Sequence, residues 1–328
     1  MELFLLKFRY NNPPCHFIYL FIRSSMSQRA LLLVNRRSRR GEDTISEAVN
    51  ELQALGFDLL EKSTEKPQQL PEIICQYQHQ VDLVIVGGGD GTLNAVAEGL
   101  VDTQLPLGIL PLGTANDLAR TLAIPQSIPQ ACQIIAGGNT QRIDLGCVNN
   151  KHFFNVASLG LSVQITRQLT KETKRKWGVF AYAAAALQAF RKARPFKAEI
   201  RINGDSIPVK TIQIAVGNGR FYGGGMVVAE DATINDQQLD LYSLEIQHWW
   251  QILALLPAMR QGSQASWTAV RALRGQDIEI HTQKPRPINA DGEIVTKTPA
   301  HFRLVPQAVS VFVPKLQVVP GLEKSDEE

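Results

Sequence analysis

The chain is poor in cysteine and has no long apolar segment. Its 328 residues include only 4 cysteines, which are scattered along the sequence and form no C-x-x-C pair. This pattern argues against a disulfide framework or a zinc site, and it is typical of reduced thiols in a reducing compartment. No stretch reaches the ~18 uncharged apolar residues that a membrane span needs. We therefore expect a cytoplasmic protein.

The charge is nearly balanced. Lysine and arginine total 34, aspartate and glutamate total 31, and the formal net charge is +3. A charge this small does not indicate nucleic acid, so we expect no nucleic-acid partner, although a local basic patch could face an anionic membrane. Hydrophobic content of 44% is ordinary for a globular protein, and the length favours two domains.

Both ends of the chain differ from the rest. A second methionine, Met26, stands just before the apolar run at residues 30–34. We expect residues 1–25 to be an extension that is disordered or not native, and the alternative is a segment that touches a membrane. Residues 319–328 are expected to be a tail.

Well-known phosphate-binding motifs are also missing. The sequence has no G-x-x-x-x-G-K-[ST] loop, no G-x-G-x-x-G spacing at residues 87–91, and no H-R-D or D-F-G set. A phosphate site in this chain must therefore be a different glycine-rich turn.

One such turn follows a buried strand pattern. The apolar run 81–86 stops at three glycines and Asp90, and a helix-compatible pattern then begins. Glycine lets the backbone approach a ligand closely, and Thr92 is expected to cap the helix, leaving N–H groups free for phosphate. The alternative is a tight turn without a ligand.

Strands and helices alternate in the first half of the chain. Strand patterns at 30–35, 57–60, 83–86 and 107–110 are separated by helical patterns, which predicts βαβ units and a mainly parallel sheet. Ligands bind at the carboxyl ends of such strands. Asn35, the glycine turn and residues 111–117 all fall there, so we predict a nucleotide-binding α/β domain over residues 26–140.

The pattern changes after residues 137–139. Residues 196–202 alternate between apolar and charged, as in a half-buried antiparallel strand, and Asn203-Gly204 then predicts a hairpin turn. Further strands are expected at 211–216, 239–244, 277–281, 302–305 and 309–313, with helical insertions at 179–191 and 249–259. We predict an antiparallel sheet or sandwich over residues 141–318.

Four segments together resemble a known family. Residues 88–94, 111–117, 217–226 and 291–293, together with Asp236, closely resemble the diacylglycerol kinase catalytic domain family, in particular the bacterial YegS-type lipid kinases. The first segment alone also resembles NAD kinases and phosphofructokinases. The resemblance covers about residues 30–314. It implies a NAD-kinase/diacylglycerol-kinase-like α/β domain, a C-terminal β-sandwich domain and an active site in the cleft.

The resemblance implies that ATP binds to the first half of the chain. The nucleotide-binding residues that it implies are Asn35, Thr64, Gly88, Gly89, Asp90, Gly91, Thr92, Leu93, Asn94, Ala95 and Thr114. Thr64 also follows the second strand pattern, where a hydroxyl can reach a nucleotide; a turn threonine is the alternative. The first loop departs from the family pattern, because residues 35–41 contain four arginines and no proline.

The resemblance also implies catalytic and metal residues. Glu293 would accept the proton of the acceptor hydroxyl, and Asp291 would share a metal or proton network with it. On spacing alone, residues 291–293 are more often a plain hairpin turn. Mg²⁺ would be held by the Asp236 side chain and the carbonyls of Thr233 and Gln238, although Gln237 stands where the family usually has glycine.

Three further aspartates are candidates near a water-bridged metal. These are Asp90, Asp117 and Asp144. Asp117 could instead cap a helix and Asp144 could anchor a loop.

The implied activity is transfer of the γ-phosphoryl group of ATP to a lipid hydroxyl, with Mg²⁺. The partners would be a membrane lipid and the inner membrane surface. The chain would contact that surface through the lysines at 171–176 or through Trp249-Trp250. The alternative for the lysines is a solvated face, and the alternative for the tryptophans is core packing. A homodimer is the default expectation. The alternatives are a kinase with a soluble acceptor such as NAD and a non-enzymatic nucleotide-binding regulator. Nothing in the sequence separates diacylglycerol, phosphatidylglycerol and long-chain bases.

Overall fold

The computed structural model describes residues 27–34, 41–63, 66–168, 194–223, 225–227, 232–246 and 267–315, with a few single residues between 251 and 263. Several sequence predictions lie outside these residues. They concern residues 1–25, Asn35 and its arginine loop, Thr64, the lysines at 171–176, Trp249-Trp250, the helix at 179–191, nearly all of the helix at 249–259, and the tail.

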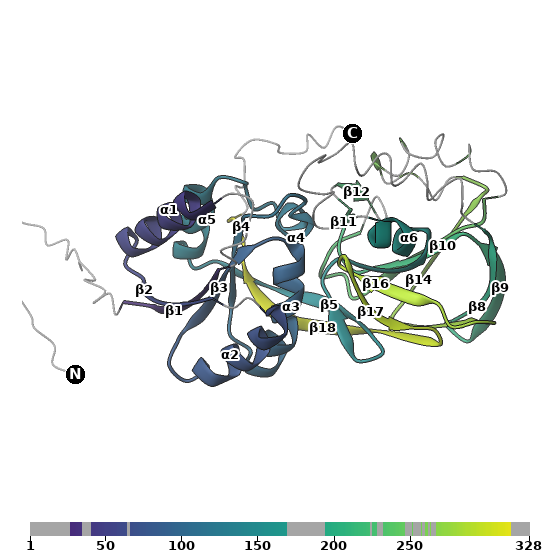
Figure 1. Cartoon of the computed structure of the whole chain (residues 1–328), viewed down its shortest axis with the longest axis horizontal. Coiled ribbons are helices and arrows are strands. Elements are labelled where there is room, and N and C mark those ends of the chain that lie inside the picture. The colour runs from purple at the N-terminus through teal and green to yellow at the C-terminus, as the bar shows by residue number, and fades with distance from the viewer. Residues whose placement is uncertain are drawn as a thin grey trace, which may run out of the picture.

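The N-terminal half is a parallel sheet covered by helices on both faces. Its strands run in the order β2 (Asp58–Lys62), β1 (Arg29–Val34), β3 (Leu83–Gly88) and β4 (Leu107–Pro111). One face carries α1 (Gly41–Ala54) and α5 (Ile128–Ala136), and the other carries α2 (Leu70–Tyr77) and α3 (Asp90–Thr103), as Figure 1 shows. A short 3₁₀ turn, Pro67–Gln69, precedes α2. Every residue of β3 and β4 is buried, which explains their continuous apolar runs.

The C-terminal half is a sandwich of two sheets. The first sheet continues from β4 into β18 (Ala300–Phe312), β15 (Asp277–Thr282), β8 (Phe196–Ile202) and β9 (Asp205–Thr211), with β5 (Thr140–Val148) and β6 (Lys151–Phe153) attached to β18. The second sheet has the order β14 (Val270–Gly275), β13 (Leu239–Leu244), β10 (Gln213–Gly217), β7 (Val156–Gly160), β16 (Pro287–Ala290) and β17 (Glu293–Lys297). Apolar side chains of both sheets form one core, including Phe302, Ile280, Ile214 and Leu241. The predicted architecture, an α/β half followed by a β-sandwich, is confirmed.

Short elements lie near the junction of the two halves. These are α4 (Asp117–Thr121) and the two-stranded hairpin of β11 (Phe221–Tyr222) and β12 (Met226–Val227), whereas α6 (Leu161–Gln168) packs on β7 and β16 of the second sheet. Figure 1 places α4 and the β11–β12 hairpin beside each other, between the two halves.

Strand β18 belongs to both halves. It pairs with β15 through residues 300–303, with β5 along most of its length, and with β4 at Val311. The prediction of two strands at 302–305 and 309–313 is therefore wrong in one respect, because these residues belong to one strand with a register shift between Val305 and Val309. Gln307 in that shift has a left-handed backbone, and its N–H donates to the buried Asp144 carboxylate at 2.7 Å. The strand predicted at 211–216 also begins later, at Gln213.

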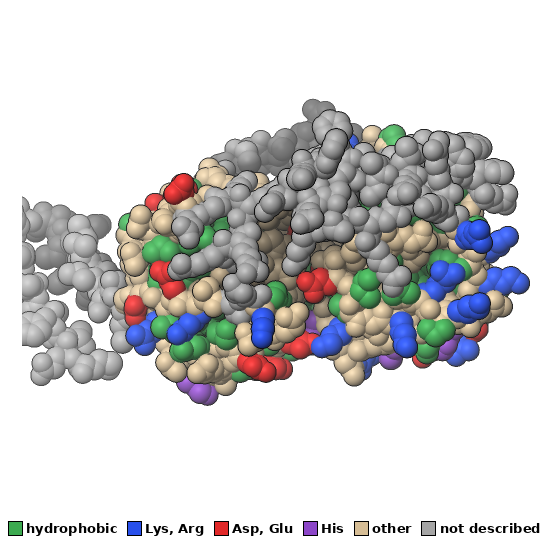
Figure 2. All heavy atoms as spheres, viewed as in Figure 1, with side chains coloured by type: hydrophobic (Ala, Val, Ile, Leu, Met, Phe, Trp, Pro, Cys, Tyr) green, Lys and Arg blue, Asp and Glu red, His purple; other side chains and the backbone are tan. Residues whose placement is uncertain are grey.

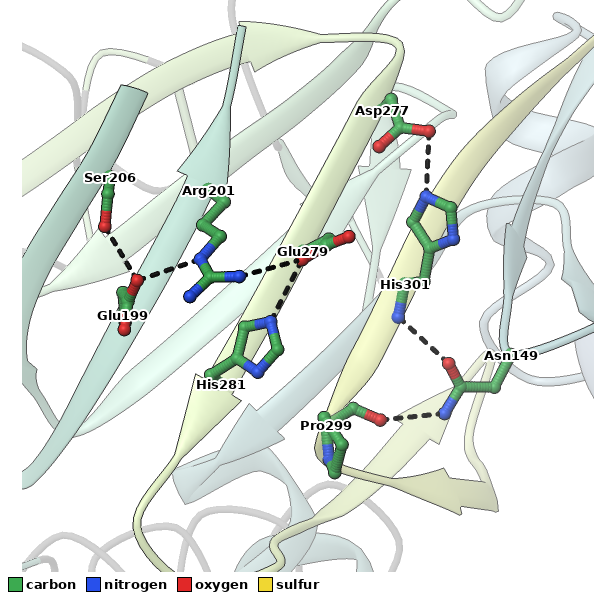
Figure 3. A network of polar contacts seen from close by, with 9 residues as sticks. All are labelled: Asn149, Glu199, Arg201, Ser206, Asp277, Glu279, His281, Pro299 and His301. Atoms are coloured by element: carbon green, nitrogen blue, oxygen red, sulfur yellow. Dashed lines mark hydrogen bonds and ion pairs between the residues drawn. The ribbon is translucent and has the colours of Figure 1, made fainter. Parts of the chain in front are cut away.

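The outer face of the first sheet carries a charged network, shown in Figure 3. The Glu199 carboxylate accepts hydrogen bonds from Ser206 (2.7 Å) and Arg201 (2.9 Å), and Glu279 faces His281 at 3.0 Å. Lys and Arg side chains gather over this C-terminal half, at the right of Figure 2. Exposed ion pairs of this kind contribute about 0–1 kcal/mol each, so we regard this face as a solvated surface.

Candidate active site

The glycine turn joins β3 to α3. Helix α3 begins at Asp90, and Gly89 is its N-cap residue, with an extended backbone and no side-chain hydrogen bond to the helix. The predicted cap at Thr92 is wrong, because Thr92 is the third residue of the helix and its N–H donates to the Gly89 carbonyl at 2.9 Å. A helix N-terminus without a side-chain cap presents backbone N–H groups, which suit an anion.

The glycines of this turn serve two different purposes. A Cβ added to Gly113 would lie 2.4 Å from the Gly89 Cα, and one added to Gly88 would lie 2.7 Å from the Thr92 Cβ. Gly113 therefore lets the glycine turn pack directly against the loop after β4, and Gly88 leaves room for Thr92 within the turn itself. Gly91 is different, because the only atom of the described residues within 4 Å of an added Cβ, apart from its own helix, is Glu293 Oε1, at 3.9 Å. Gly91 therefore faces the Glu293 carboxylate.

Asp90 and Asn116 bind the two segments together. The Leu118 N–H, in the first turn of α4, donates to Asp90 Oδ1 at 3.2 Å. Burial raises the pKa of Asp90, and backbone hydrogen bonds from residues 116–118 partly oppose this rise. Asn116 is 1% exposed and left-handed, and its Nδ2 donates to the Gly113 carbonyl at 3.1 Å. The Asp90 carboxylate thus already holds the start of α4, and Thr114 lies exposed on the same loop.

The remaining residues predicted to bind nucleotide lie in the first turns of α3. Leu93 is 1% exposed and packs in the core, so only its backbone is available to a ligand. Ala95 is half-buried against the same core. The Asn94 Oδ1 atom is buried without a hydrogen-bond partner among the described residues.

The Asp-Gly-Glu turn lies between β16 and β17. Asp291 (φ 45°) and Gly292 (φ 94°) are both left-handed, as a type I′ hairpin turn requires. The Asp291 carboxylate accepts the N–H groups of Phe154 (2.7 Å), Asn155 (3.1 Å) and Val156 (3.0 Å). The hairpin turn that spacing alone suggested is therefore present, and it is anchored by its own aspartate.

The protonation of Asp291 reflects its surroundings. Burial of the carboxyl group raises the pKa of Asp291 to about 7, and the negative charge of Asp90 adds to the rise. The three backbone N–H groups act in the opposite direction, because they stabilise the ionised form. The charge interaction also shows that the two aspartates, one from each half, lie near the same junction.

Glu293 follows directly on this turn. It is the first residue of β17, its side chain is exposed, and within the described ranges its carboxylate makes no hydrogen bond or ion pair. Its carboxylate faces Gly91 of the other half. Among the described residues, the Glu293 carboxylate has no bonding partner, in contrast to the carboxylates of Asp90 and Asp291.

The third segment, residues 217–226, closes the junction. The Asn218 and Gly219 N–H groups both donate to the Asn155 carbonyl, at 2.8 and 3.1 Å. At the other end, the Phe221 N–H donates to Thr121 Oγ1 of α4 at 3.4 Å. The segment therefore runs from the Asp291-anchored strand to the Asp90-anchored helix, and all four sequence segments meet at one place.

The predicted metal loop belongs to the second half and lies beside Asp144 of β5. The Asp236 carboxylate accepts the N–H groups of Thr233 (3.2 Å) and Gln238 (3.0 Å). Gln237 adopts a left-handed backbone, φ 58°, which glycine favours, and its N–H donates to Asp144 at 2.8 Å. Asp144, which also holds Gln307, is therefore a loop anchor. In the part of the chain that is described, no group of three or more His, Cys, Asp or Glu side chains could hold a metal.

Sequence reasoning missed two asparagines behind the site. Asn155 is 3% exposed and joins the Asp291 turn to residues 218–219. Asn289 is 6% exposed and accepts the Gly292 N–H at 2.9 Å. Neither stands in one of the four segments, and an isolated asparagine, whether in the bend between β6 and β7 or in β16, gives no local signal.

Comparison with known proteins agrees with this arrangement. Residues 29–148 match the family described as "Diacylglycerol kinase catalytic domain", and residues 155–313 match "YegS C-terminal NAD kinase beta sandwich-like domain". A Klebsiella pneumoniae protein named "Probable lipid kinase YegS-like" is 32% identical over 87% of this chain and 96% of its own length. The chain therefore belongs to the YegS-like lipid kinases, which carry a diacylglycerol kinase catalytic domain.

Other relatives extend the comparison. A "Diacylglycerol kinase" of Staphylococcus epidermidis is 26% identical over 88% of this chain and 93% of its own length. The crystal structure of a diacylglycerol kinase from Bacillus anthracis superposes with a TM-score of 0.74 at 25% identity, covering 88% of this chain and 98% of that one. An uncharacterized Synechocystis protein is 30% identical, and this chain spans 60% of its length. The enzyme class predicted from the sequence, a phosphotransferase with an alcohol acceptor, is confirmed by these relationships.

Proposed function

We propose that this protein transfers the γ-phosphoryl group of ATP to the hydroxyl of a membrane lipid, diacylglycerol or a related lipid, with Glu293 as the general base. The observation that carries this proposal is the position of Glu293 Oε1, 3.9 Å from where a Gly91 side chain would begin. A carboxylate that bonds to no described residue thus faces, from one half, a helix N-terminus of the other half that has no side-chain cap.

Each group of site residues is proposed to have its own role in phosphate transfer. The backbone at the start of α3, including Gly91, would bind the phosphates of ATP, because N–H groups of a helix N-terminus and the α3 dipole favour negative charge. Glu293 would accept the proton of the lipid hydroxyl as its oxygen attacks the γ-phosphorus. The bond from that phosphorus to the bridging oxygen breaks, and ADP leaves with the electron pair. Asp90 and Asp291 would hold the two sides of the site in place.

Mg²⁺ bound together with ATP would neutralise phosphate charge, and Mg²⁺ in the loop of Asp236 would support the second half. The loop of Asp236 fits a hard cation, because one half-buried carboxylate and the carbonyls of Thr233 and Gln238 are oxygen donors, and Mg²⁺ is often bound by one or two carboxylates and water. The acceptor is proposed to be reached at a membrane surface. No helix in the described ranges is long and apolar enough to cross a membrane.

The experiment is an acceptor panel. Purified protein is incubated with γ-labelled ATP, Mg²⁺ and either diacylglycerol in mixed micelles, a total lipid extract, or NAD without detergent, and labelled products are identified. We expect label in a lipid product with the wild type and loss of that label with Glu293→Ala. Label on NAD alone would contradict the lipid acceptor, and near-normal transfer by Glu293→Ala would contradict the base.

A further inference from the structure

A line of polar side chains lies between α6 and the second sheet, where apolar packing would be expected. This polar seam consists of Ser158 on β7, Ser162 and Thr166 on α6, and Asn289 on β16. Ser158 and Ser162 share a hydrogen bond of 2.9 Å, and Asn289 Nδ2 donates to Thr166 Oγ1 at 3.1 Å. Ser158 and Asn289 are also direct cross-strand partners.

Burying this polar seam destabilises the fold unless its polar groups form hydrogen bonds in one arrangement. Ser158 is 5% exposed and Asn289 is 6% exposed, and burying amide or hydroxyl groups is unfavourable without hydrogen bonds. A bonded seam in turn specifies one geometry between the helix and the sheet. The hydrogen bonds therefore fix the orientation of α6 on the second sheet, which an apolar contact alone would not do.

Asn289 links the polar seam to the Asp-Gly-Glu turn by hydrogen bonds. While its Nδ2 bonds Thr166, its Oδ1 accepts the Gly292 N–H at 2.9 Å. The pairing of β16 with β17 shifts register between Ile288 and Asn289. Irregularities of this kind redirect a side chain and are frequent beside active sites. Asn289 thus bonds the N–H of Gly292, the residue that directly precedes Glu293.

The two anchors of the turn are different in kind. Asp291 ties it to the backbone of residues 154–156, inside the sandwich. Asn289 ties it to a side chain on α6. We propose that Asn289 is a positioning residue, which holds Glu293 over Gly91 by bonding Gly292 and takes its own orientation from Thr166. This inference rests on the proposed function, because it assigns Glu293 the role of base.

Three variants test the inference in the full-length protein. Asn289→Ala removes both hydrogen bonds, Thr166→Val removes only the anchor on α6, and Thr166→Ser keeps the hydroxyl. Ile288→Val is the matched control, because it shortens a buried side chain of the neighbouring residue without touching the seam. The kcat for lipid phosphorylation, the KM for ATP and the melting temperature are measured for each.

We expect Asn289→Ala to lower kcat about 10- to 100-fold with little change in the KM for ATP, because a small displacement of a catalytic group has effects of this size. Thr166→Val should give a smaller loss, Thr166→Ser none, and the Asn289→Ala/Thr166→Val double variant should be no slower than Asn289→Ala. A kcat for Asn289→Ala equal to that of Ile288→Val, at similar melting temperature, would overturn the inference.

Amide hydrogen exchange separates this inference from the proposed function. Peptides covering residues 289–295 should exchange faster in Asn289→Ala than in Ile288→Val, whatever acceptor the enzyme uses. An active wild type with unchanged exchange in Asn289→Ala contradicts the positioning role alone. A wild type that phosphorylates no lipid contradicts the proposed function, and the exchange result then still shows whether Asn289 holds the turn.

Discussion

The glycine turn of the first half and the Asp-Gly-Glu turn of the second half face each other and are built in opposite ways. The glycine turn depends on missing side chains, because Gly89 and Gly113 touch through their backbones. The Asp-Gly-Glu turn depends on side chains, because Asp291 accepts three N–H groups and Asn289 accepts a fourth. One turn is therefore sensitive to added atoms and the other to lost hydrogen bonds.

The comparison also separates the acidic residues by role. Asp90, Asp144, Asp236 and Asp291 all accept backbone N–H groups and hold loops. Glu293, two residues after Asp291, accepts no such bond within the described part of the chain. A carboxylate that is already bonded to the backbone stabilises the site, whereas an unbonded one is available for proton transfer. The following variants test that division, from the largest expected effect to the smallest.

Adding one methyl group at Gly113 should have the largest effect on stability. In Gly113→Ala, the new Cβ would lie 2.4 Å from the Gly89 Cα, and backbone must move to accept it. We expect the free energy of unfolding to fall by about 3 kcal/mol, at the upper end of overpacking costs. Urea denaturation measures this fall, and an unchanged midpoint would show that the two loops do not pack closely.

The same substitution at Gly91 should act on activity. Outside its own helix, the new Cβ of Gly91→Ala meets no atom of the described residues closer than 3.9 Å, so the fold should tolerate it. It would occupy the space between the helix N-terminus and Glu293, and we expect kcat/KM for ATP to fall about 10- to 100-fold, which corresponds to roughly 1.4–2.7 kcal/mol. Steady-state kinetics beside a melting curve tests this, and normal kinetics would place ATP elsewhere.

Asp291 should make stability depend on pH. Its folded pKa of about 7 lies above the ordinary value of 3.8, so between these values the native state binds one proton more than the unfolded state. The contribution of Asp291 to stability is then fully present below about pH 4 and is lost as the pH rises to 7.

Comparison with Asp291→Asn isolates this effect. Urea midpoints are measured for both proteins from pH 4 to pH 8, and the advantage of the wild type over the variant should shrink across that window. A difference that does not change with pH would show that the raised pKa is wrong.

Gln237→Gly should have the smallest effect and the opposite sign. Gln237 has a left-handed backbone, a conformation that costs a residue with a Cβ about 1–2 kcal/mol. Glycine removes this cost, but the unfolded chain with glycine has more conformational freedom, which offsets part of the stabilisation. We expect a net stabilisation of about 0.5 kcal/mol, with Gln237→Ala, which keeps the Cβ, as the control. Equal stability of the two variants would show that the backbone is not strained.

Local patterns in the sequence were enough to predict the alternating strands and helices, and the resemblance located all four segments. They could not predict how distant contacts alter a local element. Thr92 is a good N-cap type, but Gly89 already has the extended backbone that begins the helix. The irregularity in β18 depends on a bond from Gln307 to Asp144, which lies 163 positions earlier. Asn289 is recognisable only once α6 packs beside it.

The central claim is that Glu293 performs chemistry while Asp291 holds the turn, and one paired measurement tests it directly. Single-turnover phosphate transfer from ATP to lipid and the melting temperature are measured together for Glu293→Gln and Asp291→Asn. We predict that Glu293→Gln loses about 10²- to 10⁴-fold in rate with an unchanged melting temperature, and that Asp291→Asn loses melting temperature with a much smaller loss of rate. The reverse pattern, with Asp291→Asn folded but inactive and Glu293→Gln active, would contradict it.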